Sequence, residues 1–343
     1  MDNTYWSEMI DDTLKGRVEK PRISGLTMII DTGIPISMMR DLLELASGSI
    51  DFWKFGFASA SVYPKERVMD KVSLCQEYGV FAYPGGTSLE IAIAQNKWKP
   101  YLESLWYHGI RVVEVSDGTI DLPLRLRREV IRTARKMGFT VLSEVGKKQP
   151  GVFLPVPEQS QMIQGDLNSG ANYIIVEGRE GGVGIGVYDQ LGDVRDKDVQ
   201  LLLDALGPLS TRLMWEAPLA KQQTYYVKKL GNKVNLGNIR PLDIVTLESL
   251  RRGFRSDTLR LGLGMPDEAD VSTGRNNETQ FHAAGVEDDA SSSDSGAKPT
   301  LWAGKSHSSV QDKENKFRQS GLSRKKPFQA PTENRDDTDR KQF

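Results

Sequence analysis

The chain has 343 residues, of which 38% are hydrophobic and 32 are glycine, so it can bury the core of one large domain or of two smaller ones. Its 45 Lys and Arg residues nearly balance its 46 Asp and Glu residues, and the net charge of -1 excludes a global field that would attract nucleic acid or an anionic membrane. A single cysteine, Cys75, excludes an internal disulfide and any cysteine-rich zinc site.

Residues 1–24 precede the first apolar run, and we interpret them as an N-terminal extension. Residues 1–20 are acidic and polar, and they lack the charged-then-apolar order of a signal peptide. No apolar stretch in the chain approaches the roughly 18 residues of a membrane-spanning helix. We therefore expect a cytoplasmic protein with no membrane partner.

Between residues 25 and 263, short β-rich runs alternate with amphipathic helical stretches. The expected strands are Leu26–Asp31, Ile50–Phe55, Val80–Pro84, Val112–Ser116, Thr140–Glu144, Tyr173–Glu177, Leu213–Glu216 and Val234–Asn238. The expected helices are Ile36–Ala46, Lys65–Tyr78, Trp98–Tyr107, Leu124–Met137, Glu158–Asn168, Asp196–Ala205, Leu219–Leu230 and Leu242–Arg251. Several strands are apolar nearly throughout, as is typical of parallel strands buried on both faces. Eight such units in this length predict an α/β fold, specifically a (β/α)8 TIM barrel.

An open, doubly wound sheet is the alternative to the barrel. The dinucleotide-binding form of that fold has the pattern Gly-x-Gly-x-x-Gly between its first strand and first helix. The segment Asp31–Pro35 lacks this pattern, so the sequence favours the barrel.

The segment Gly178–Asp196 is too long for a bare connection between a strand and a helix. It is rich in glycine, with Gly181, Gly182, Gly184 and Gly186. We expect either a flap that contains a small hairpin or an unstructured surface insertion.

The composition changes abruptly after Leu263. Residues 264–343 are rich in Ser, Asp, Lys, Gly, Asn and Gln and contain few branched apolar residues. Such a segment cannot bury enough surface to offset its ordering entropy, so we predict a disordered, low-complexity C-terminal tail.

A chain that ends near Leu263 is expected to keep the activity and the melting temperature of the full-length protein, because a tail that buries no core adds little stability. Differential scanning calorimetry of the two proteins measures this. A large fall in melting temperature on truncation would mean that the tail packs on the barrel.

Nearly every expected strand ends in a polar or charged residue. These residues are Asp31, Lys54, Gly85, Gly86, Thr87, Glu114, Ser116, Asp117, Glu144, Glu177, Glu216, Asn235 and Asn238. In a (β/α)8 barrel the C-terminal ends of the strands, which we call the rim, contain the active site. Taken singly, each residue could equally be a helix cap or part of a rim ion pair. Several carboxylates that converge there would repel one another without a cation, which predicts a divalent metal, and with only three histidines in the chain Mg²⁺ fits better than zinc.

Basic residues also occur where they could meet anions. Lys54 ends a strand, Lys147 and Lys148 follow Glu144, and Arg179 follows Glu177. Phosphate sites in these barrels recur after strands seven and eight. Here the eighth expected strand contains Asn235 and Asn238, and Arg255 and Ser256 follow it in the sequence. The alternative for Lys148 is a solvated charge on a surface loop.

Eight short runs, in the same order along the chain, resemble phosphosulfolactate synthases. The runs are Asp51–Gly56, Tyr83–Thr87, Glu114–Gly118, Ser143–Lys148, Val176–Glu180, Trp215–Pro218, Val234–Ile239 and Leu250–Thr258. The resemblance extends over about residues 25–259. Three features depart from the family pattern: Ala58-Ser59 in place of Gly-Thr, Gly237 in place of Ala, and the long tail.

The resemblance implies a (β/α)8 lyase that uses Mg²⁺ to add sulfite to phosphoenolpyruvate. The product is (2R)-phospho-3-sulfolactate, a precursor in coenzyme M biosynthesis or of sulfolactate, which are sulfonates. The family's catalytic lysine falls on Lys148, which would protonate the substrate carbon as a general acid; that role needs a pKa lowered toward the working pH. Lys54 is the second candidate catalytic residue, where it could bind sulfite or a carboxylate.

The remaining site residues are assigned by the charge of the groups that they would meet. We expect Mg²⁺ to bind among Glu114, Glu144 and Glu177. We expect the substrate phosphate to be bound by Arg179, Arg255 and backbone amides. The other candidate substrate-binding residues are Ser256, Gly85, Gly86, Asn235 and Asn238.

Two other functions stay open at this point. A rim lysine also serves Schiff-base aldolase-type lyases, and borohydride trapping with a carbonyl substrate separates the two chemistries. A non-catalytic, stress-associated barrel protein is the third hypothesis, because distant plant relatives of the family are linked to heat tolerance. The presence of Lys148, Glu144 and Arg179 favours an enzyme whose partners are small anions, and the sequence leaves open whether it forms a homo-oligomer.

Overall fold

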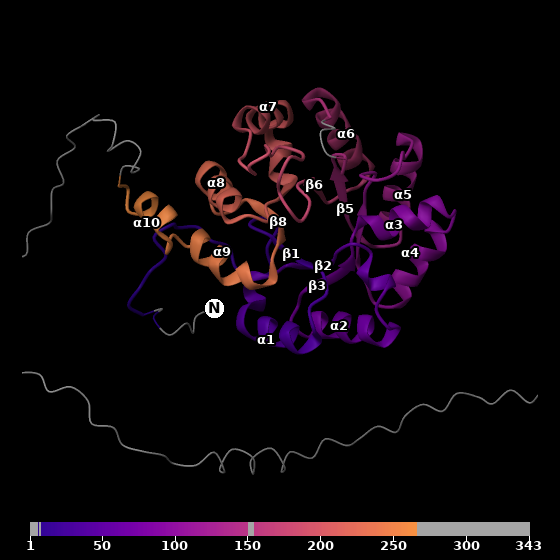
Figure 1. Cartoon of the computed structure of the whole chain (residues 1–343), viewed down its shortest axis with the longest axis horizontal. Helices are drawn as coiled ribbons and strands as arrows, with labels where there is room; N and C mark the ends of the chain where they lie inside the picture. Colours follow the sequence, from indigo (N-terminus) through magenta and orange to yellow (C-terminus); the bar gives the residue numbers. More distant parts are fainter. Residues whose placement is uncertain (1–5, 7, 150–153, 266–343) are drawn as a thin grey trace, which may run out of the picture. The chain divides into compact units, whose positions relative to one another are not determined.

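A computed structural model of the chain describes residue 6 and residues 8–149 and 154–265 (Figure 1). Within them, eight parallel strands form one sheet in the order β3-β2-β1-β8-β7-β6-β5-β4, which curves into a nearly closed barrel. The strands are β1 (Thr27–Asp31), β2 (Phe52–Phe55), β3 (Phe81–Pro84), β4 (Val112–Val115), β5 (Thr140–Val145), β6 (Tyr173–Val176), β7 (Leu213–Glu216) and β8 (Asn235–Ile239). The predicted (β/α)8 barrel is confirmed. The predicted tail lies, from residue 266 onward, outside the described residues.

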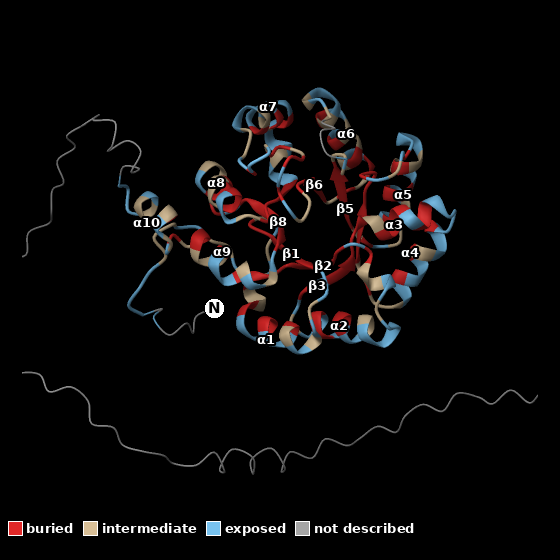
Figure 2. Ribbon diagram, viewed as in Figure 1, coloured by how far each residue is buried: buried red, intermediate tan, exposed pale blue. Residues whose placement is uncertain are grey.

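Helices surround the sheet and turn their buried faces toward it (Figure 2). The helices are α1 (Ile36–Ala46), α2 (Lys65–Glu77), α3 (Gly86–Ala94), α4 (Trp98–Tyr107), α5 (Leu124–Lys136), α6 (Val156–Ser169), α7 (Asp196–Leu206), α8 (Ala220–Leu230), α9 (Ile244–Arg251) and α10 (Ser256–Gly262), of which α10 packs instead on α8 and α9. The expected strands and helices are each found within two residues of their expected bounds. The sequence analysis missed α3 and α10. Helix α3 is short, begins with a glycine and is buried over most of its surface, so its sequence shows no amphipathic period.

Strand β2 shows which side chains point into the barrel and which point outward to the helices. Successive side chains of a strand point to opposite faces. Trp53 points outward, where its Nε1 donates to Asp31 Oδ2, and Phe55 faces the Lys71 ammonium of α2. Lys54, between them, points into the barrel and contacts a carboxylate from β7. The same alternation on the other strands therefore brings polar side chains together inside the rim.

The N-terminal extension packs at the end of the barrel where the strands begin. Arg22 pairs with Asp51 at 2.7 Å, and Arg17 pairs with Glu248 of α9 at 2.9 Å. A cavity of about 670 Å³ lies at this end, lined in part by the extension and by the first residues of β2, β3, β5 and β6. It is at the opposite end of the barrel from the rim.

The glycine-rich segment Gly178–Asp196 is a packed connection. Tyr188 and Val194 form an isolated antiparallel bridge, which is the small hairpin in its shortest form. The side chains of Ile185, Val187 and Tyr188 are buried, and Tyr188 Oη donates a hydrogen bond to the backbone carbonyl of Glu216. The flap thus contacts the end of strand β7, and the alternative of an unstructured insertion is wrong.

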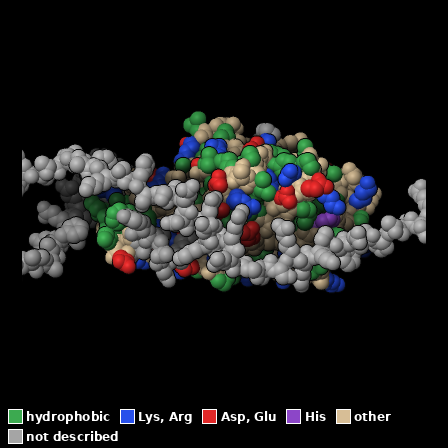
Figure 3. All heavy atoms as spheres, turned by 90° about the horizontal axis from the view of Figure 1, so that it is seen from below, with side chains coloured by type: hydrophobic (Ala, Val, Ile, Leu, Met, Phe, Trp, Pro, Cys, Tyr) green, Lys and Arg blue, Asp and Glu red, His purple; other side chains and the backbone are tan. Residues whose placement is uncertain are grey.

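One face of the described part of the chain has mixed charge. On the face shown in Figure 3, Lys and Arg side chains are interspersed with Asp and Glu side chains and with hydrophobic ones. Among residues 8–149 and 154–265, no helix has the length and apolar character needed to cross a membrane.

Candidate active site

Lys54, on strand β2, lies among carboxylates from three other strands. Its Nζ is 3.0 Å from Glu216 Oε1, 3.1 Å from Glu114 Oε1 and 3.5 Å from Glu144 Oε2. Its side chain is only 8% exposed. Burial disfavours its charge, but the three carboxylates outweigh burial and raise the pKa of Lys54 well above its ordinary value. The ammonium is therefore charged and paired with carboxylates of the protein itself, in the position where sulfite or a carboxylate was expected.

Glu114 is bound by donors from two neighbouring elements in addition to Lys54. Tyr83 Oη donates to Glu114 Oε2 at 2.9 Å, and the backbone N–H of Gly86 donates to Oε1 at 2.7 Å. A Cβ at position 86 would overlap Ser116 Oγ, so only glycine lets this N–H approach the carboxylate. Burial, more than the charge of neighbouring Glu144, raises the pKa of Glu114, although Lys54 opposes the rise. Gly86 therefore serves the carboxylate directly, whereas the Gly85 N–H donates to the Phe55 carbonyl at 3.0 Å.

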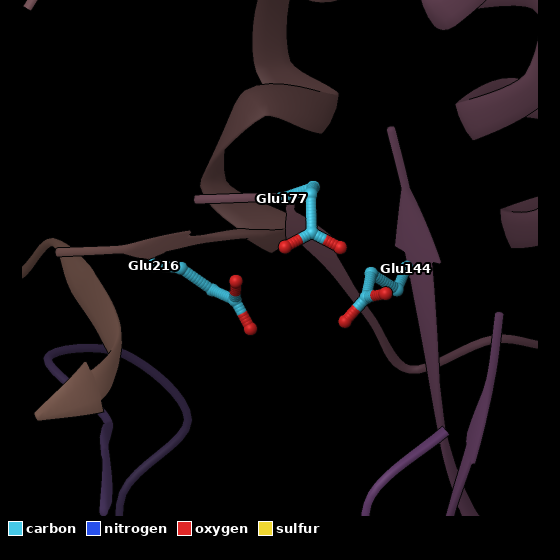
Figure 4. Close-up of side chains that lie close together, drawn as sticks. All are labelled: Glu144, Glu177 and Glu216. Atoms are coloured by element: carbon cyan, nitrogen blue, oxygen red, sulfur yellow. The ribbon is translucent and has the colours of Figure 1, made fainter. Parts of the chain in front are cut away.

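Three other carboxylates form a group that could bind a metal ion. Glu144 on β5, Glu177 directly after β6 and Glu216 on β7 each offer one oxygen, and these oxygens all lie within 4.8 Å of one another (Figure 4). Each of the three residues is 1% exposed. Oxygen ligands of this kind suit Mg²⁺ or another hard cation. Of the residues predicted to bind the metal, Glu144 and Glu177 are in this group and Glu114 is outside it.

Glu216 is the member of the group that the sequence analysis did not assign to the metal. It ends strand β7, so the same strand-end rule that selected Glu144 and Glu177 could have selected it. Its Oε2 accepts hydrogen bonds from the backbone N–H groups of Gly178 and Arg179, both at 2.9 Å. Its carboxylate is therefore held from the flap on one side and by Lys54 on the other.

The group has more negative charge than its basic neighbours compensate. Four carboxylates (Glu114, Glu144, Glu177 and Glu216) lie near two ammonium groups (Lys54 and Lys148), an excess of two negative charges when all are ionised. Burial raises the pKa of Glu177, and the charges of Glu144 and Glu216 raise it further. Burial acts on Glu144 too, but Lys148 and Lys54 outweigh it and lower its pKa. Glu177 Oε2 has no hydrogen-bond partner within the described residues, which fits a position for a cation.

Lys148, in the loop after β5, reaches over this group. Its Nζ is 2.9 Å from Glu144 Oε1 and 3.8 Å from Glu177 Oε2, and its side chain is 25% exposed. A Cβ at Gly118 would come within 3.0 Å of three carbons of the lysine stem, so the glycine leaves room for the side chain. Burial disfavours the charge of Lys148, but Glu144 and Glu177 outweigh it and raise its pKa. The expectation of a lowered pKa is wrong for this arrangement of charges.

Arg179 and Asn238 also lie at the rim. The backbone N–H of Arg179 donates to Glu177 Oε1 at 2.7 Å, and Asn238 Nδ2 donates to the Arg179 carbonyl at 3.1 Å. Both residues have a positive φ, 55° and 51°, which is uncommon outside glycine. The Arg179 side chain is 39% exposed and lies close to the backbone of Lys148. Its Nε lies 3.7 Å from Glu180 Oε2, and it is more exposed than Lys54 or Lys148.

The structure places three of the expected substrate-binding residues away from the rim. Asn235 begins strand β8, where its Nδ2 donates to the Thr211 and Leu213 carbonyls. Arg255 and Ser256 follow α9, which returns the chain to the end of the barrel where the strands begin. Gly253, just before them, accepts a hydrogen bond from the N-terminal extension. The sequence rule places phosphate sites directly after strand eight, but here a whole helix separates β8 from these residues.

Comparison with known proteins identifies the family. Residues 15–257 match the family described as (2R)-phospho-3-sulfolactate synthase (ComA). The chain is 40% identical over 245 residues to phosphosulfolactate synthase of Methanothermobacter thermautotrophicus, covering 71% of this chain and 94% of that protein. It is 34% identical over 247 residues to phosphosulfolactate synthase of Bacillus subtilis, covering 71% and 96%. It is 22% identical over 261 residues to Protein HEAT-STRESS-ASSOCIATED 32 of Arabidopsis thaliana, covering 68% and 88%. The extent of the family match and the identity to two named synthases show that this chain belongs to the phosphosulfolactate synthase family.

Proposed function

We propose that this chain is a Mg²⁺-dependent phosphosulfolactate synthase, a lyase that adds sulfite to phosphoenolpyruvate. The observation that supports it most directly is the position of Lys148, whose ammonium lies 2.9 Å from one of three clustered carboxylates at the rim. A proton donor next to a cation-binding group is what addition to phosphoenolpyruvate requires. Membership of the family supplies the substrate class.

In the proposed reaction the sulfur of sulfite attacks the methylene carbon of phosphoenolpyruvate, and a C–S bond forms. The electron pair of the C=C bond moves onto the neighbouring carbon and into the carboxylate, as in an enolate. Lys148 then gives a proton to that neighbouring carbon, which completes (2R)-phospho-3-sulfolactate. Glu144 and Glu177 keep the Lys148 ammonium protonated. A cation bound by the same two carboxylates would offset their charge and lower the pKa of Lys148 toward the range that a general acid needs.

In this proposal Glu144, Glu177 and Glu216 hold the Mg²⁺ ion. When all four carboxylates are ionised, the excess of two negative charges equals the charge of one divalent cation, and the ligand atoms are all oxygens. When bound, the ion supplies a positive charge that stabilises negative charge developing on the substrate carboxylate. Lys54 keeps Glu114, Glu144 and Glu216 close together, and Arg179 binds the phosphate.

The direct test is to incubate the purified protein with phosphoenolpyruvate, sulfite and Mg²⁺ and to detect phosphosulfolactate by mass spectrometry. We expect product only when all three are present. A parallel incubation with carbonyl substrates and borohydride tests the aldolase alternative, because a Schiff base on Lys148 would be reduced to a stable adduct. A folded protein that forms neither the product nor an adduct would contradict both enzyme functions and favour the stress-associated role.

Removing divalent cations is expected to abolish the synthase activity, because the carboxylate group would repel the anionic substrate without a compensating charge. Activity is measured after exhaustive EDTA treatment and dialysis, and again after Mg²⁺ is added back. We expect loss and then recovery. Full activity in the EDTA-treated protein would contradict a metal-dependent reaction.

A further inference from the structure

A buried arginine on helix α5 contacts the end of the strand that carries Glu144 and the loop after β4 against which Lys148 packs. Arg127 is 0% exposed, and its guanidinium lies behind the rim, between α5, β5 and α6. It donates to Asp117 Oδ1 at 3.1 Å, to Ser143 Oγ at 2.6 Å and to the Glu144 carbonyl at 2.8 Å. It also makes two hydrogen bonds to Asp166 Oδ2, at 2.9 and 2.7 Å.

The first segment is the end of strand β5. The hydrogen bond from Arg127 to the Glu144 carbonyl fixes the backbone of a residue whose carboxylate faces the opposite way, into the rim. Ser143, the residue before it, donates to Asp166 Oδ2, which Arg127 also contacts. The position of the Glu144 carboxylate therefore depends on a guanidinium on the other side of the strand.

The second segment is the loop after strand β4. Asp117 pairs with Arg127, and the next residue, Gly118, accepts a hydrogen bond at 3.1 Å from the backbone N–H of Lys148. The Lys148 stem lies directly against the Cα of Gly118. A shift of Asp117 would therefore move the surface on which the Lys148 side chain rests.

We propose that Arg127 is a positioning residue, which sets the distance between Lys148 Nζ and the Glu144 carboxylate without touching the substrate. This inference rests on the function proposed above, since it concerns the same site. Arginine suits the role because its planar guanidinium presents five N–H donors in a fixed geometry, here directed at several acceptors at once. The two aspartates, Asp117 and Asp166, compensate its buried charge.

The test compares Arg127→Lys with Arg251→Lys. Arg251 is also 0% exposed and donates to the Asn232, Val234 and Leu26 carbonyls, but it lies at the end of the barrel where the strands begin. We expect Arg127→Lys to lower kcat by about 10- to 100-fold with little change in KM, as is typical for residues that orient catalytic groups. Arg251→Lys should lower the melting temperature and leave kcat of the folded protein unchanged. Equal kcat values for the two variants would overturn the proposal.

A second measurement does not depend on turnover. Hydrogen exchange of the Lys148 amide, which donates to Gly118, is expected to be faster in Arg127→Lys than in the unsubstituted protein and unchanged in Arg251→Lys. If the unsubstituted protein makes no phosphosulfolactate, the proposed function fails and this exchange experiment still decides the positioning role. Unchanged exchange at Lys148 in Arg127→Lys would overturn it.

Asp117→Asn supplies a variant for the case in which Arg127→Lys does not fold. It keeps the size of the side chain and removes the charge that faces Arg127 at 3.1 Å. We expect the same faster exchange at the Lys148 amide and a smaller fall in kcat. An Asp117→Asn protein with unchanged exchange would contradict the path from Arg127 through Asp117 to Lys148.

Discussion

Replacing Lys148 by alanine is expected to lower kcat of phosphosulfolactate formation by about 10²- to 10⁴-fold, the usual contribution of a general acid or base. The ammonium is the group placed to deliver a proton, 2.9 Å from Glu144 Oε1. The side chain is partly exposed at its tip and packs along Gly118, so its removal should leave the barrel folded. Steady-state kinetics with phosphoenolpyruvate and sulfite, together with a melting curve, measure the two effects separately.

Lys147→Ala is the control for this experiment. Lys147 is the adjacent lysine, but its Nζ bonds to the Asp117 and Ile120 carbonyls and points away from the carboxylate group. We expect its loss to change kcat only slightly, because Arg127 still holds Asp117. A Lys148→Ala protein with raised KM and unchanged kcat would mean that Lys148 binds an anion and does not transfer the proton.

Replacing Lys54 by methionine is expected to destabilise the fold by about 3–5 kcal/mol, the range found when one partner of a buried ion pair is removed. Methionine has a similar length, so the packing loss is small. In the unsubstituted protein the Glu114 and Glu216 carboxylates lie 3.1 and 3.0 Å from Lys54 Nζ, and the substitution removes this positive charge. Urea denaturation of the two proteins measures the difference in free energy of unfolding.

The destabilisation by Lys54→Met should also depend on pH. The charge of Lys54 lowers the pKa values of Glu114 and Glu144, so both rise without it, that of Glu114 from a value that burial already raises. A carboxyl whose pKa is higher in the folded state than in the unfolded chain stabilises the fold at low pH, and that contribution is lost as the pH rises through its folded pKa. The loss in free energy of unfolding caused by Lys54→Met should therefore be larger near pH 8 than near pH 5, since carboxyls with raised pKa values ionise in about this range.

Lys229→Met is the matched control for Lys54→Met. Lys229 pairs with Asp196 at the surface, where the two side chains are 24% and 60% exposed. Exposed pairs contribute about 0–1 kcal/mol, so this variant should stay close to the unsubstituted protein at both pH values. Equal losses in the two variants would mean that the carboxylates inside the rim do not depend on Lys54.

The barrel was predictable because its signal is local. Each strand is a short run of apolar residues, and each strand ends in a polar residue that the fold must bring to the rim. Glu144 and Glu177 were found in this way, and Glu216 obeys the same rule, whereas the role of Lys148 came from the resemblance to the family. Helix α3 was missed since it is buried on nearly all sides and so has no periodic pattern.

The contacts between elements were not predictable in this way. Arg127 is one of six basic residues on helix α5, and nothing in the sequence separates it from the others. Its partners at positions 117, 143 and 166 become neighbours only after the barrel forms. The prediction for Arg255 failed for the opposite reason. This residue is close to strand eight in the sequence, but helix α9 lies between them and leads the chain away from the rim. In both cases the missing information was the path of the helix, which a local pattern does not contain.

The unequal exposure of the rim side chains determines the order in which an incoming molecule meets them. Lys148 and Arg179 are 25% and 39% exposed, whereas the three clustered glutamates are 1% exposed. A solute arriving from water therefore meets these two basic side chains, with Glu180 3.7 Å from Arg179, before it reaches the clustered carboxylates. Under the proposed function, an anion would be attracted to the basic groups and would need to share a cation with the carboxylates to go deeper. The depth of the site would then favour an anion accompanied by a divalent ion before any specific contact with the substrate.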